Sequence, residues 1–151
     1  MADSNYSFVR FLAKFGAAGA VPATDKTGRA LTAAGNATVV ADGGALTGAY
    51  LTLDGTGDYV TTPGTTDLRL GAGDFCIDFG VKTSASNKCL IDHFDGTNTG
   101  WQVFLDSSGH LAWWNDTVLT TGAIAVNDGN RHHVAIFRVG GTIYMDVDGT
   151  M

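Results

Sequence analysis

Residues 128–149 contain two runs in which apolar and polar side chains alternate, each bounded by turn-forming residues. The first run covers residues 132–139 and the second residues 142–147, with Gly140 and Gly141 between them. A repeat of two residues sends alternate side chains to opposite faces of an extended strand, and paired glycines favour a tight turn. The stretch therefore predicts an antiparallel hairpin and constrains the chain to a fold rich in strands.

The same alternation recurs along the rest of the chain. All 15 acidic residues are Asp, which favours turns, and the helix-favouring Glu is absent, while 21 of the 151 residues are Gly. We predict an all-β antiparallel sandwich of about a dozen short strands. Besides the final hairpin, its strands are expected at residues 6–15, 30–32, 37–40, 49–53, 59–61, 75–82, 88–94, 101–106, 110–115, 117–120 and 123–125, with one helical turn at residues 66–68.

Charge and hydropathy exclude several classes of partner. The net charge is −6, and the nine Lys and Arg residues are scattered singly, so we expect binding to neither nucleic acid nor an anionic membrane. No apolar run approaches the roughly 20 residues of a transmembrane helix. The N-terminus lacks the layout of a signal peptide, so synthesis in a cytoplasm is expected.

The two cysteines, Cys76 and Cys89, are too few for a disulfide framework. If residues 74–82 and 88–94 form a simple hairpin, Cys76 lies near Phe94 and not near Cys89. We therefore expect two reduced thiols that behave as small, half-buried apolar residues.

Four segments resemble laminin-G-like and concanavalin A-like jelly rolls. Residues 51–60 (LTLDGTGDYV) resemble the family's F-D-G-x-x-D-Y-V element, and residues 73–82 (GDFCIDFGVK) resemble its G-D-F-T-I-E-F-W-V-K strand. Residues 128–135 (DGNRHHVA) and 143–149 (IYMDVDG) resemble its D-G-x-W-H-H-V-A and L-Y-V-D-G elements. Together with residues 35–38, the pattern is closest to the laminin-G-like domains of tailed-bacteriophage structural proteins.

The chain departs from the family in three places. Arg131 and Gly80 stand where Trp is common, and the family continues with two or three more strands after residue 149. We expect an N-terminal extension at residues 1–6 and one jelly-roll domain at residues 7–151 that lacks its final strands. The missing strands would come from a longer polypeptide or from another subunit, because unpaired sheet edges promote aggregation.

Two arrangements suggest chemistry but have simpler explanations. The related glucanases carry a Glu-x-Asp-x-Glu strand, and this chain has only Asp74 and Asp78 near that strand, so no enzymatic activity is expected. His132 and His133 are adjacent in a predicted strand, where neighbouring side chains point to opposite faces. We therefore expect one packed and one surface histidine instead of a metal-binding pair.

Calcium is the ion that the resemblance implies, and no other cofactor is required. Asp54, Asp58, Asp92 and Asp95 lie on or beside loops and offer the oxygen ligands that calcium prefers. Their spacing matches no ordered calcium loop, so the alternative is that these aspartates simply form turns.

Residues 110–115 supply the candidate binding residues. Leu111 and Trp113 should face the core, which turns Trp114 outward, where it can stack on a sugar or anchor a protein interface. Tyr59 and Asn115 would accompany Trp114 at the rim of a binding groove. The alternative is that Trp114 packs under a loop or against the missing strands.

The resemblance implies a non-enzymatic structural protein on a bacteriophage virion, made in the host cytoplasm and bound to other virion proteins of the capsid or tail. Capsid decoration or cement is the first expectation. A tail-fibre module that recognises host glycans is the alternative, and a secreted carbohydrate-binding module is a further one. In either virion role we expect an oligomer or a fold completed by further strands.

Overall fold

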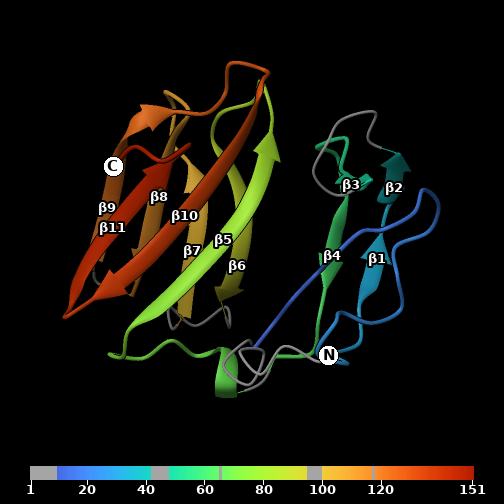
Figure 1. Cartoon of the computed structure of the whole chain (residues 1–151), viewed down its shortest axis with the longest axis horizontal. Coiled ribbons are helices and arrows are strands. Elements are labelled where there is room, and N and C mark those ends of the chain that lie inside the picture. The colour runs from blue at the N-terminus through green and yellow to red at the C-terminus, as the bar shows by residue number, and fades with distance from the viewer. Residues whose placement is uncertain (1–9, 42–47, 65, 95–99, 117) are drawn as a thin grey trace. The chain divides into compact units, whose positions relative to one another are not determined.

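The computed structural model describes residues 10–41, 48–64, 66–94, 100–116 and 118–151, whose regular elements are antiparallel strands apart from one short 3₁₀ turn (Figure 1). The predicted all-β antiparallel fold is confirmed. The chain divides into two compact units, Met1–Thr65 (unit 1) and Thr66–Met151 (unit 2). The assignment of residues 7–151 to one jelly-roll domain stays a prediction. No helix in the described ranges has the length and apolar character needed to cross a membrane.

Unit 1 holds two small antiparallel ladders. Strand β1 (Thr32–Ala34) pairs with β4 (Tyr59–Thr61), and β2 (Thr38–Ala41) pairs with β3 (Ala49–Thr52). Two-stranded sheets are marginally stable in water, so loop contacts matter here.

Asp25 organises the loop before β1. Its buried carboxylate accepts hydrogen bonds from the backbone N–H groups of Leu12, Thr27 and Arg29 at 2.8–3.0 Å. The carbonyl of Leu12 accepts the N–H of Lys26. The backbone of Leu12 is thus bonded to a loop and not to a strand, so the predicted strand is wrong for residues 10–15. Residues 6–9 lie outside the described part.

Unit 2 contains two sheets whose inner faces pack together (Figure 1). The three-stranded sheet has the order β11 (Thr142–Val147), β10 (Arg131–Val139), β5 (Phe75–Lys82). The four-stranded sheet has the order β6 (Lys88–Phe94), β7 (Gly100–Leu105), β8 (His110–Asn115), β9 (Val118–Ala125). The 3₁₀ turn η2 (Thr66–Leu68) precedes them, as expected from the sequence.

The core of unit 2 lies between these sheets. Its buried members come from both sheets and from the loop after β9, namely Val103, Leu105, Leu111, Trp113, Val126, Val134, Ile136 and Val147. Trp113 lies at its centre, with its ring centroid 4.9 Å from that of Phe75 and 5.5 Å from that of Trp101. Each such fully buried large side chain contributes roughly 1.5–3 kcal/mol. Leu111 and Trp113 face inward, as predicted.

One buried cation interrupts this apolar face. Arg138 lies on the inner face of β10 with Val134 and Ile136, and although it is charged it is only 7% exposed. Its guanidinium donates hydrogen bonds to the carbonyls of Leu70, Gly71 and Gly73 and lies 5.0 Å from the centre of the Phe75 ring. The side chain therefore closes the loop that leads into β5.

Strand β9 corrects one sequence expectation. Residues 117–120 and 123–125 were expected as two strands around a turn, but one strand runs through Gly122. The side of Gly122 faces β11, and a Cβ atom there would lie 3.2 Å from Sδ of Met145. This glycine allows a close approach between strands instead of a reversal of the chain.

Strand β5 corrects a second expectation from the sequence, which concerned its pairing partner. The supposed hairpin of residues 74–82 with residues 88–94 does not form, because β5 pairs with β10 and β6 pairs with β7. Cys76 accordingly lies opposite Phe137 in the ladder. Both cysteines are free, as predicted, but they are exposed and not half-buried.

Candidate functional site

Strand β11 has one free edge. Among the described strands it pairs only with β10. Backbone groups of an antiparallel strand alternate between its two sides, and those of Val147 point away from β10, because they bond to Thr150. The backbone N–H and C=O groups of Ile143 and Met145 share that orientation. We call this side of β11, at residues 143–145, the free edge.

A tight turn bounds the free edge. Asp148 and Gly149 both have positive φ, at 53° and 85°. The N–H of Val147 donates to the carbonyl of Thr150 at 2.8 Å, and the N–H of Thr150 donates back to Val147 at 2.9 Å. This is the geometry of a type I′ hairpin turn, which places Thr150 beside β11 on the side opposite β10.

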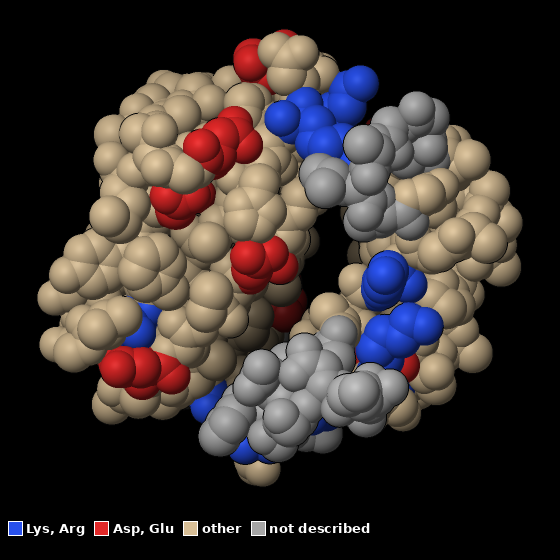
Figure 2. Space-filling view, in the orientation of Figure 1, with Lys and Arg blue, Asp and Glu red and all other residues tan. Residues whose placement is uncertain are grey.

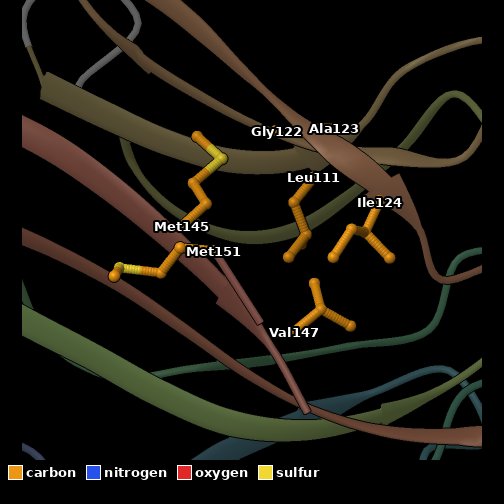
Figure 3. A pocket seen from close by; sticks show the side chains of 7 residues that line it. All are labelled: Leu111, Gly122, Ala123, Ile124, Met145, Val147 and Met151. Atoms are coloured by element: carbon orange, nitrogen blue, oxygen red, sulfur yellow. The ribbon is translucent and has the colours of Figure 1, made fainter. Parts of the chain in front are cut away.

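An apolar hollow lies between the edges of the two sheets, next to the free edge. It is lined by Leu111, Gly122, Ala123, Ile124, Met145, Val147 and Met151, is partly open to solvent and has a cavity volume of only about 10 Å³. Figure 3 shows Leu111, Ile124 and Val147 turned toward one another, with Met145 and Met151 on the other side. That volume is room for about one water molecule, so the hollow is a shallow apolar depression and not a ligand pocket.

His132 joins the turn to the loop between β9 and β10. Its Nδ1 lies 2.7 Å from Oδ2 of Asp148, and its Nε2 lies 2.9 Å from Oδ1 of Asp128. The histidine side chain is only 14% exposed, whereas the two carboxylates are half exposed. We call these three side chains the histidine clasp. Oδ1 of Asp148 also accepts the N–H of His133 at 2.8 Å.

The clasp shifts the acidity of its members. Hydrogen bonds to Asp128 and then Asp148 raise the pKa of His132 above its usual value, although burial opposes the shift. Hydrogen bonds from His132 and Asn130 lower the pKa of Asp128 to about 2. The N–H of His133 and then the His132 ring lower the pKa of Asp148. All three groups are therefore charged at mildly acidic pH.

His133 points to the opposite face of β10, as the sequence predicted. Its side chain is 56% exposed, and its Nε2 lies 3.0 Å from Oδ2 of Asp78 on β5. Figure 2 shows carboxylates at several separate places over the face that β5, β10 and β11 form. No group of three or more His, Cys or Asp side chains in the described ranges is arranged to hold a metal ion.

The aspartates suggested for calcium are placed as follows. In unit 1, Asp58 accepts the N–H groups of Asn36 and Asp54, at 2.8 and 2.9 Å, and Asp54 accepts that of Thr56 at 2.7 Å. These are the contacts of turn-forming aspartates. Asp92 belongs to unit 2, where Sγ of Cys89 lies 3.9 Å from its Oδ2. Asp95 lies outside the described residues, and the calcium assignment stays a prediction.

The residues suggested for ligand binding do not form one described site. Tyr59 is 55% exposed in unit 1, whereas Trp114 and Asn115 lie on β8 of unit 2. Trp114 is half-buried, opposite Gln102 and Leu119. Oδ1 of Asn115 is buried and has no hydrogen-bond partner in the described part of the chain. Their common role in a binding groove stays a prediction.

Sequence reasoning missed the histidine clasp and the buried Arg138. A signal was available for both, because His132 and Arg138 fall in register with Val134 and Ile136 on the apolar face of the predicted strand. Their partners, however, lie up to 68 residues away in the sequence.

Comparison with known proteins adds no identity to this geometry. No protein-family model, no curated protein and no solved structure matches the chain.

Proposed function

We propose that the chain is a non-enzymatic structural protein of a bacteriophage virion, of the capsid decoration or cement type. Its four laminin-G-like segments support a virion protein, and the free edge of β11 beside the apolar hollow supports a role in assembly. The free edge is the observation that carries the proposal, because an unpaired strand edge is a template for pairing with another chain.

The partner fitted by this edge is an extended strand of a neighbouring virion subunit. Such a strand would add antiparallel to β11 and bond to the N–H and C=O groups of Ile143 and Met145. Alternate side chains of the strand would pack over the apolar residues of the hollow, where the flexible thioethers of Met145 and Met151 adapt to different shapes. Strands β5, β6 and β9 are also outermost, but at β11 the pairing of Thr150 with Val147 already begins the row of bonds that an added strand would continue.

A host-glycan-binding module is the second candidate, and one observation favours it. The ring of Tyr59 is largely exposed, and exposed aromatic rings stack on sugars. In this role the protein would occur in few copies at the tail, and Tyr59→Ala would abolish adsorption to the host without changing the copy number.

Two substitutions at one position test the strand-pairing proposal. Met145→Pro removes the N–H that points to the free edge and leaves the ladder with β10 intact, whereas Met145→Ala removes the side chain but keeps the N–H. Phage carrying either allele would be purified, and the copies of this protein per particle counted by quantitative mass spectrometry.

We expect Met145→Ala particles to retain most copies and Met145→Pro particles to lose them. Circular dichroism and urea unfolding of the two purified variants control for folding. Equal copy numbers in both, with both variants folded, would reject pairing at β11. Absence of the unsubstituted protein from virions would reject the virion role itself.

A further inference from the structure

The geometry of the histidine clasp requires a doubly protonated ring. Each nitrogen of His132 faces a carboxylate oxygen within 2.9 Å. A neutral imidazole carries one N–H and one lone pair, so it can satisfy only one of the two carboxylates. The other carboxylate would then face a lone pair at hydrogen-bond distance, which is repulsive. Loss of one proton from His132 must therefore break one arm of the clasp.

The clasp joins three segments that also have other hydrogen bonds of their own. Asp128 lies in the β9–β10 loop, His132 near the start of β10, and Asp148 in the turn after β11. The turn has further bonds to β10, because the N–H of Asp148 donates to the carbonyl of His133 and the N–H of His133 donates to Asp148. Breaking the arm to Asp148 thus loosens the turn without unfolding the sandwich.

We propose that the histidine clasp is a pH-sensitive latch, which holds the Asp148–Gly149 turn against β10 when His132 is charged and releases it when His132 loses its proton. The raised pKa of His132 agrees with this and sets the sign. The latch is closed below the pKa of His132 in the folded chain and opens as the pH rises through it. At the acid end it opens again as Asp128 and Asp148 take up protons.

Other charged groups on the surrounding elements are arranged differently. On β10 itself, Arg131 is exposed and the His133 ring points to the opposite face, where it meets Asp78 of β5. Lys82 of β5 lies opposite Arg131 in the ladder. Asp146 of β11 accepts the N–H of Gly149. The charges acting on the His132 ring are those of Asp128 and Asp148.

The latch acts on the turn that bounds the free edge, so its consequence for assembly rests on the proposed function. With the latch closed, Thr150 stays beside Val147 and the edge is presented in one register. With the latch open, the turn keeps its backbone bonds between Val147 and Thr150 but loses the side-chain bond to His132 that steadies it against β10. We therefore expect binding of a strand at residues 143–145 to weaken as the pH rises through the pKa of His132.

The latch can be tested on the isolated chain without any partner. NMR would follow the titration of the His132 ring and the hydrogen exchange of the Gly149 and Thr150 amides across the same pH range. After correction for intrinsic exchange, opening should accelerate these amides several-fold across the pH range in which the His132 ring titrates. The amides of Val134 and Ile136, in the core, should not change.

Three variants sharpen the test. His132→Gln should give fast exchange at Gly149 and Thr150 at every pH, with no step. Asp128→Asn leaves a single carboxylate, that of Asp148, which a neutral ring satisfies with its one N–H, so the ring should titrate at lower pH and the step in exchange should disappear. His110→Gln is the matched control, because it removes a histidine–aspartate pair, with Asp106, from a different turn.

A pH-independent turn in the unsubstituted chain would overturn the latch, as would an unchanged step in His132→Gln. Either result leaves strand pairing open, since the Met145→Pro comparison measures pairing separately. Conversely, a clear step in exchange with equal virion copy numbers for the two Met145 variants would keep the latch and reject its role in assembly.

Discussion

Replacing the buried Arg138 by Met should destabilise unit 2 by about 3 kcal/mol. Met has a similar length, so the substitution leaves little cavity and mainly removes the donors to Leu70, Gly71 and Gly73. A hydrogen bond from a charged donor contributes roughly 1.5–3 kcal/mol, part of which water can replace at the exposed Gly71 and Gly73, and the lost contact with Phe75 adds about 0.5–2 kcal/mol. The substitution also removes the cost of burying a cation away from water, which offsets several kcal/mol of this loss.

The assay is urea unfolding followed by tryptophan fluorescence, because Trp101 and Trp113 lie in the core of the same unit. A loss of about 3 kcal/mol is a large share of the 5–15 kcal/mol typical of a domain. The unfolding free energy of Arg138→Lys should lie between those of the unsubstituted chain and Arg138→Met. A lysine ammonium keeps the charge but lacks the planar guanidinium that reaches several carbonyls. A loss below about 1 kcal/mol for Arg138→Met would refute the reasoning that the guanidinium closes this loop.

Three further predictions follow from single contacts. Unfolding free energy should be greatest at mildly acidic pH. Urea titrations should show the free energy of unfolding falling as the pH rises through the raised pKa of His132. The free energy should also fall as the pH drops toward the Asp128 pKa of about 2, and a profile without pH dependence would contradict the clasp. Gly149→Val should disorder the turn, because a β-branched residue resists a φ of 85°. The measurement is amide exchange at Thr150, which should become fast. Gly73→Val is the control, because Gly73 has no positive φ. Although the residue Cys89 is exposed, the protein atoms around its thiol partly exclude water, and together with Asp92 this desolvation raises the pKa of Cys89 to about 11. Iodoacetamide should therefore label Cys89 slowly at pH 8 and faster in Asp92→Asn, and rapid labelling of the unsubstituted chain would count against this environment.

Local periodicity predicted those elements whose formation depends on neighbouring residues. The final hairpin and β5 appear where alternation and turn residues placed them. Gly122 was misread as a turn, because a glycine that permits close approach to Met145 looks the same in sequence as one that permits reversal. The segment at residues 10–15 also alternates well, but its backbone is bonded to the Asp25 loop.

Long-range choices could not be predicted in the same way. The sequence shows that β5 is a strand but not that its partner is β10, more than 40 residues later, instead of the adjacent β6. The clasp depends on this pairing and on the fold of the turn, because Asp148 reaches His132 only once β10 and β11 are aligned. His132 and Asp128 could be singled out by spacing, but the second carboxylate could not.

The most direct test of the proposed function is cryo-electron microscopy of purified virions, combined with a mass-spectrometric copy count. The proposal predicts many copies of this protein on the capsid, with a strand of a neighbouring subunit lying antiparallel along residues 143–145 of β11. Absence from the virion, or a capsid-bound protein whose β11 edge faces solvent, would contradict it.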